Sequence, residues 1–206
     1  MPLRRASLPS TCCVLGVLLL AGCGGGGGSD GPQVQTLTGY FVDAPVAGVT
    51  YATATQSGVT GANGAFSYVA GERVRFAIGD IELGNAAAGE TVTPVDLVPG
   101  AADETDNRVT NMVRLLMTLD ADGDASNGIQ VPERAATAAT GVTLDFDMAP
   151  EAFSTDAALS GYLAAANVSA SLVDAQAAQR HLDATLDGFS SWGQLTFGSS
   201  VWRASN

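Results

Sequence analysis

Apolar and polar residues alternate through much of the stretch from residue 35 to residue 98, which is typical of strands with one buried face. In the segment ERVRFAIG, Val74, Phe76 and Ile78 alternate with Arg73 and Arg75. Turn signals, among them an Asn-Gly pair at 63–64, recur roughly every 8–12 residues, as in all-β folds. The pattern predicts an N-terminal antiparallel β-sandwich over residues 35–100.

The periodicity changes near residue 104. Apolar residues then fall at helical spacing; they are Val109, Met112, Val113, Leu116 and Leu119. Further helices are expected from about residue 132, over 157–166 and over 171–188. A capping box at Ser171 would begin the last of these, and Gly188 would end it. The pattern therefore predicts an α+β chain in which residues 101–206 are mainly helical and end in a hairpin over 194–204.

The first residues read as a targeting segment. Arg4 and Arg5 precede an apolar run over residues 13–20, which is too short for a membrane-spanning helix of about 20 residues. The string Leu20-Ala21-Gly22-Cys23 follows and resembles the lipobox of bacterial lipoproteins. The resemblance implies that residues 1–22 are a cleaved signal peptide and that Cys23 is lipidated.

A glycine-rich stretch follows Cys23 and predicts a flexible tether over residues 23–34. In lipoproteins, an aspartate directly after the lipidated cysteine favours retention in the inner membrane. Gly24 occupies that position. The resemblance therefore implies a lipid anchor in the outer membrane, on either its periplasmic or its cell-surface face.

The formal net charge is -12, and all nine basic residues are arginines. Cleavage before Cys23 removes two arginines and no acid, so the mature chain would carry -14. Such a chain is repelled by phosphate backbones, and nucleic-acid binding is not expected. Cys12 and Cys13 would also be lost, which leaves no disulfide and no free thiol.

One internal block carries a second resemblance. The segments GYFVDAPVAGVTYAT and GVTGANGAFSYV contain Asp43-Ala44-Pro45-Val46, and later Gly64 and Phe66. They look like the transthyretin-like or carboxypeptidase-regulatory-like β-sandwich. The resemblance covers about 60 residues and implies a fold that usually serves as a non-catalytic accessory or adhesion module.

Catalytic signals are weak. His181 is the one histidine, and it lies beside the apolar stripe of the last predicted helix. It would serve either as a general base or as a packed helix residue. The segment GFSSWG, residues 188–193, is not a Gly-x-Ser-x-Gly elbow, because Trp192 stands two residues after Ser190, and the sequence contains no Walker-type loop. We therefore expect a protein that is not an enzyme.

The acidic stretch LDADGDASNGIQVPE, residues 119–133, suggests a Ca²⁺ site. A twelve-residue frame from Asp122 resembles an EF-hand or dockerin-like loop, with Asn127 where that loop needs glycine. Asp120 is an additional candidate ligand. The six candidate metal ligands are Asp120, Asp122, Asp124, Ser126, Gly128 and Glu133. The alternative is a solvated turn in which the acids act as caps.

Together these patterns predict an outer-membrane lipoprotein that binds an unknown protein or glycan partner without catalysis, with Ca²⁺ as a candidate stabilising ion. The alternative is a small hydrolase, or an accessory subunit of a secreted enzyme or export system. A concave site with two carboxylates near His181 would favour that alternative.

Overall fold

The computed structural model describes residues 34–191. It is a mixed α+β structure in which the larger strands come first and the helices follow, as predicted. The strands are β1 (Thr36–Phe41), β2 (Val46–Ala47), β3 (Thr50–Ala52), β4 (Ser57–Val59), β5 (Ala65–Val69), β6 (Arg73–Ile78), β7 (Ile81–Ala87), β8 (Thr91–Val92) and β9 (Ile129–Gln130). The α-helices are α1 (Asn107–Leu119), α2 (Glu133–Ala138), α3 (Pro150–Ser154), α4 (Ala157–Ala165) and α5 (Ala175–Ser191).

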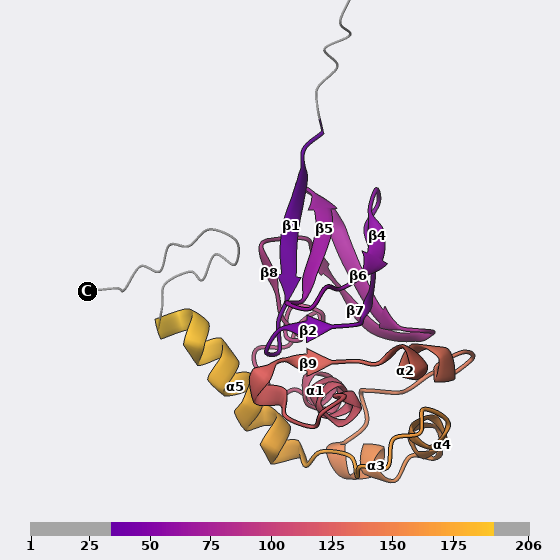
Figure 1. The fold of residues 1–206 in the computed structure, drawn as a ribbon. Helices are drawn as coiled ribbons and strands as arrows, with labels where there is room; N and C mark the ends of the chain where they lie inside the picture. Colours follow the sequence, from indigo (N-terminus) through magenta and orange to yellow (C-terminus); the bar gives the residue numbers. More distant parts are fainter. Residues whose placement is uncertain (1–33, 192–206) are drawn as a thin grey trace, which may run out of the picture. The chain divides into compact units, whose positions relative to one another are not determined.

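The strands form three sheets (Figure 1), with the orders β5-β1-β8, β4-β3-β6-β7 and β2-β9. The pairs between β1 and β5, β3 and β4, β3 and β6, and β6 and β7 are antiparallel, as predicted. Two short pairs are parallel instead, β1 with β8 and β2 with β9. The wholly antiparallel prediction was wrong for them because β8 and β9 return to their partners through long crossovers rather than hairpins.

Aromatic rings join the two larger sheets. Phe41 of β1 stacks on Phe76 of β6 with ring centroids 4.4 Å apart. Phe66 of β5 meets the same ring edge-on at 5.3 Å. In β6 the arginines at 73 and 75 are exposed while Val74 and Phe76 are buried. The period of two in the sequence therefore places the apolar face of β6 against the other sheet.

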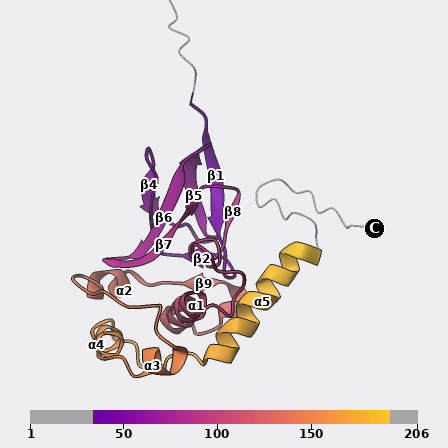
Figure 2. The same ribbon diagram turned by 180° about the vertical axis from the view of Figure 1, so that it is seen from behind.

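Helix α1 is the centre of the helical part (Figures 1 and 2), and ten of its residues are buried. It packs against α5 and α3, and it also contacts β9. Buried side chains from both sides of residue 100 belong to one hydrophobic cluster that extends from Phe41 to Leu182. The strand region and the helical region therefore share a core.

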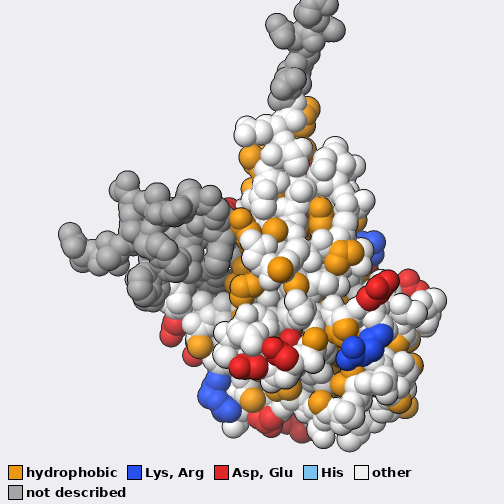
Figure 3. Space-filling view, viewed as in Figure 1, with side chains coloured by type: hydrophobic (Ala, Val, Ile, Leu, Met, Phe, Trp, Pro, Cys, Tyr) orange, Lys and Arg blue, Asp and Glu red, His pale blue; other side chains and the backbone are white. Residues whose placement is uncertain are grey.

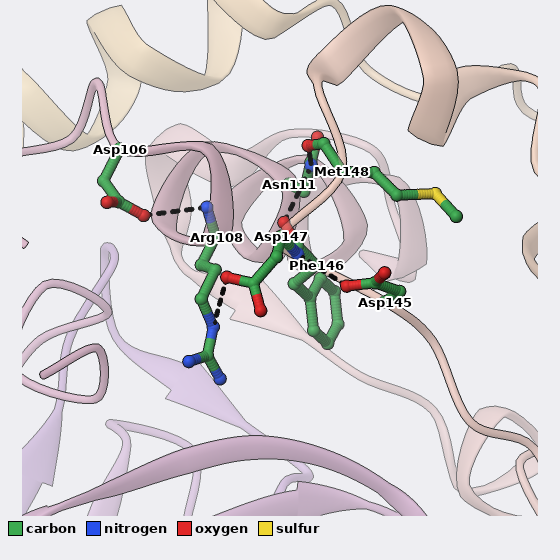
Figure 4. A network of polar contacts seen from close by, with 7 residues as sticks. All are labelled: Asp106, Arg108, Asn111, Asp145, Phe146, Asp147 and Met148. Atoms are coloured by element: carbon green, nitrogen blue, oxygen red, sulfur yellow. Dashed lines mark hydrogen bonds and ion pairs between the residues drawn. The ribbon is translucent and has the colours of Figure 1, made fainter.

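The start of α1 is fixed by polar contacts (Figure 4). Asp106 caps the helix by accepting a hydrogen bond from the Arg108 backbone N–H at 2.8 Å, and the Arg108 side chain lies 3.4 Å from Asp147. One turn later, the Asn111 side-chain amide donates to the carbonyls of Phe146 and Met148. These bonds hold the 145–148 segment, which has no regular structure, against the buried helix.

Two predictions about α5 were wrong. Asp174 caps the helix by accepting bonds from the N–H groups of Gln176 and Ala177, so Ser171 is not the cap. Aspartate at an N-cap satisfies the first free N–H groups, which makes a second cap three residues earlier redundant. Gly188 does not end the helix, which continues to Ser191. Glycine only weakens a helix interior, by about 1 kcal/mol, and it ends a helix only where the backbone turns left-handed.

The helix α3 was not predicted, and the predicted hairpin over 194–204 lies outside the described residues. Of the helices in the described part, none is both long and apolar enough to cross a bilayer.

Candidate functional site

The acidic stretch forms a closed loop between α1 and β9. Asp120 lies at the C-terminal end of α1, and its Oδ1 accepts a hydrogen bond from the Gln130 N–H at 2.8 Å. The Ala121 N–H donates to the Gln130 carbonyl at 3.0 Å. These two bonds bring the ends of the loop together and hold the Asp120 carboxyl in place.

Two further aspartates order the interior of the loop. Asp122 Oδ1 accepts the Asp124 N–H at 2.9 Å, and Asp122 Oδ2 accepts the Asn127 side-chain amide at 3.1 Å. Asp124 Oδ1 accepts both the backbone N–H and the hydroxyl of Ser126, and it thereby caps a 3-10 turn over residues 125–127. Asp122 and Asp124 therefore have different partners although they are only two residues apart.

A cavity of about 170 Å³ opens beside the loop. Acidic side chains gather on the surface near the start of β9 (Figure 3). Three of the six predicted ligands line the cavity, namely Asp120, Asp122 and Gly128. The others, Asp124, Ser126 and Glu133, are exposed and are not part of its lining.

Two carboxyl groups, those of Asp120 and Asp122, lie side by side at this cavity and influence one another's pKa. Asp120 is only 9% exposed, and its Oδ2 accepts no hydrogen bond. Burial raises the pKa of Asp120, the Gln130 N–H opposes this, and the Asp122 carboxylate beside it raises the pKa further. Hydrogen bonds from the Asp124 N–H and the Asn127 amide lower the pKa of Asp122. The two carboxyls are therefore shifted in opposite directions, and Asp120 is the one that is harder to ionise.

The loop departs from an EF-hand in two respects. The frame from Asp122 needs a positive φ at Asn127, but the positive φ angles of this loop are at Gly123 and Gly128. Glu133, the predicted bidentate ligand, is exposed in the first turn of α2. Within residues 34–191, no three His, Cys, Asp or Glu side chains come together as a metal-binding group.

A second polar contact was missed by the sequence analysis. Asp43, in the turn between β1 and β2, is completely buried, and His181 Nε2 of α5 lies 3.4 Å from its Oδ1. The same nitrogen lies 3.4 Å from the Asp43 carbonyl oxygen. Neither carboxyl oxygen of Asp43 has a hydrogen bond with good geometry. Burial raises the pKa of Asp43 well above its usual value, so the imidazole at 3.4 Å does not outweigh desolvation.

The backbone explains how Asp43 becomes buried. Ala44 has a φ of +50°, an unusual value for a residue with a side chain, and Val42 forms an antiparallel bridge with Pro45. This tight turn directs the chain into β2, whose neighbour Pro45 accepts the Ile129 N–H at 2.9 Å. The helix α5 then covers the turn from a position 138 residues further along the chain.

No protein-family model, curated protein or solved structure matches this chain. The predicted lipidation site, Cys23, lies outside the described residues.

Proposed function

We propose that the protein is an outer-membrane lipoprotein whose folded part is a non-catalytic binding or accessory module. The observation that carries the proposal is the string Leu20-Ala21-Gly22-Cys23 ahead of a glycine-rich stretch. Strand β1 begins at Thr36, thirteen residues after that cysteine. A fully extended chain of this length spans at most about 45 Å, so lipid on Cys23 would keep the module close to the membrane.

The packing of the strands supports a β-sandwich of the transthyretin-like kind. Rings from the β5-β1-β8 sheet pack on Phe76 of the other sheet. The segment Asp43-Ala44-Pro45-Val46 forms the turn into β2, and Gly64 with a φ of +77° directly precedes β5. Both blocks that carry the resemblance therefore occupy structural positions, which agrees with a scaffold rather than an enzyme.

The partner we propose is a protein or glycan of the cell envelope. The strongly negative net charge disfavours nucleic acid and anionic lipid surfaces. Cross-linking in intact cells, followed by purification of the lipidated protein, would identify the partner. A variant without the anchor is the control for capture after lysis.

The alternative function is a small hydrolase. The observation that bears on it is the Asp43–His181 pair, because an aspartate next to a histidine also occurs in catalytic triads. In catalytic triads the carboxylate binds one imidazole nitrogen while the other faces a nucleophile. Here Nε2 faces Asp43, and the contact is buried between α5 and the β1–β2 turn. The pair is better suited to holding α5 in place, and we therefore favour the non-catalytic module.

The test of the anchor is Cys23→Ser in cells. We expect loss of fatty-acid labelling and release of the protein from the membrane fraction. Cys13→Ser is the matched control, because Cys13 lies in the segment that cleavage would remove, and it should leave both readouts unchanged. If the parent protein takes up no fatty acid but stays in the membrane fraction, the lipoprotein proposal is wrong.

A further inference from the structure

We propose that Asp120 and Asp122 form a binding site for one hard divalent cation, Ca²⁺ first, at the C-terminal end of α1. This inference does not depend on the lipid anchor. It replaces the twelve-residue ligand frame expected from the sequence by a smaller set built around the buried carboxyl.

The first argument is the unpaired oxygen. Asp120 is about nine-tenths buried, Oδ1 is bonded to the Gln130 N–H, and Oδ2 is buried with no donor. A buried carboxylate oxygen without a partner costs free energy, so such groups are normally neutralised by a proton or by a cation. The Asp122 side chain, which lines the same cavity, brings two more acceptor oxygens, and these already accept hydrogen bonds from the Asp124 N–H and the Asn127 amide.

The second argument is the chemistry of the cavity lining. The polar groups lining it are two carboxylates, two side-chain amides and backbone groups, with neither histidine nor cysteine among them. Oxygen ligands suit Ca²⁺ and Mg²⁺, whereas zinc prefers nitrogen and sulfur. Two carboxylates also balance the charge of one divalent ion. The cavity is open to solvent, so water can complete the six to eight ligands that Ca²⁺ takes.

The third argument is that the other two acidic residues of the stretch, Asp124 and Glu133, have other positions or partners. Asp124 Oδ1 already caps the 3-10 turn through two bonds from Ser126. Glu133 begins α2 and is exposed. With only two carboxylate ligands, the affinity should be modest, in the range of about 10⁻⁴–10⁻³ M seen for extracellular calcium modules.

The experiment is thermal unfolding of the full chain, purified in detergent, at pH 7.5. We compare 5 mM CaCl₂ with NaCl of equal ionic strength, and with MgCl₂. Ca²⁺ should raise the Tm of the parent by roughly 2–8 °C. Mg²⁺ should do less, because it demands regular octahedral geometry and dehydrates reluctantly.

Three variants separate this site from the alternatives. Asp122→Asn and Asp120→Asn should each abolish the Ca²⁺ shift, and titration calorimetry should then show no binding heat. Asp122 is exposed, so its amide variant should still fold. Glu133→Gln removes one charge from the same stretch but should keep the full shift.

Loss of the shift in Glu133→Gln would overturn the proposal in favour of the EF-hand-like ligand set. A shift that survives in all three variants would also overturn it, because Ca²⁺ would then act elsewhere. Superimposable melts of the parent with Ca²⁺ and with NaCl, without binding heat, would show that the loop is only a capped, solvated turn.

Discussion

The buried carboxyl of Asp43 should make the stability of this protein depend on pH in an unusual direction. Most aspartates in folded proteins have pKa values near or below that of the unfolded chain, about 3.9, and so they stabilise the fold as pH rises. Burial raises the pKa of Asp43 instead. Its contribution is therefore fully present below about pH 4 and is lost as pH rises through the folded-state pKa.

The size of the effect follows from proton linkage. Between the two pKa values the folded state holds one proton that the unfolded state has released, so stability falls by at most about 1.4 kcal/mol per pH unit. Asp43→Asn removes the titrating group but retains a neutral side chain of nearly the same shape. The free energy of unfolding of the variant, relative to the parent, should therefore increase with pH from about 4.5 upward.

Urea unfolding of the parent and of Asp43→Asn, at half-unit steps from pH 4.5 to 8.5, measures this difference. Subtracting one free energy of unfolding from the other cancels the contributions of all titrating groups that the two proteins share. Asp183→Asn is the control, since Asp183 is an exposed carboxyl on the same helix as His181, and its curve should stay parallel to that of the parent. Parallel curves for Asp43→Asn and the parent across the whole range would show that the folded protein does not hold a proton on Asp43.

Two further predictions test the packing around the site. Arg114 is buried in α1 and donates four hydrogen bonds of 2.6–3.1 Å, three of them to residues of the 150–173 stretch. Arg114→Met should lower the free energy of unfolding in urea by roughly 2–4 kcal/mol, because it removes all four of these hydrogen bonds and leaves the buried Asn111 side-chain oxygen and the partly buried Val173 carbonyl without the Arg114 donor. A loss under about 1 kcal/mol would contradict this. Gly48 and Gly71 both have positive φ, but a Cβ at Gly48 would collide with the Val131 backbone whereas one at Gly71 meets nothing. Gly71→Ala should lower the free energy of unfolding by about 1–2 kcal/mol, which is the cost of a left-handed backbone at alanine. Gly48→Ala should lower it by at least about 2 kcal/mol more, because the added Cβ collides with the Val131 backbone. Equal losses in the two variants would mean that the β2–β9 contact is not rigid.

The sequence predicted those elements whose periodicity is long enough to show one buried face. Strand β6 repeats the alternation three times, and α1 repeats its apolar spacing over 13 residues. Shorter elements have no such signal. Strand β9 has two residues and pairs with β2 more than 80 residues away, so its existence depends on a tertiary contact and not on local pattern. The cap of α5 was misplaced for a related reason, since Ser171 and Asp174 are both good N-caps and local preference does not choose between them.

The acidic loop and the Asp43–His181 contact differ in how much of each could be predicted from the sequence. In the acidic loop, the residue types and their spacing identified Asp120, Asp122 and Gly128, all of which line the cavity. Glu133 is not part of the cavity lining, because β9 pairs with β2 and α2 begins shortly after it, at Glu133 itself.

In the sequence, Asp43 was notable only as part of the block Asp43-Ala44-Pro45-Val46, which carries the β-sandwich resemblance. The sequence around Asp43 does not show that α5 contacts this turn. The contact comes from His181, which lies 138 residues further along the chain. A charged group acquires a perturbed pKa through what surrounds it in space, and here the surroundings come from the opposite end of the fold. The same reasoning applies to Asp120, whose Oδ2 is buried at the end of α1 without a hydrogen-bond donor. Residue spacing can therefore nominate a ligand, but burial and the count of hydrogen-bond donors determine which carboxyl needs a proton or a cation.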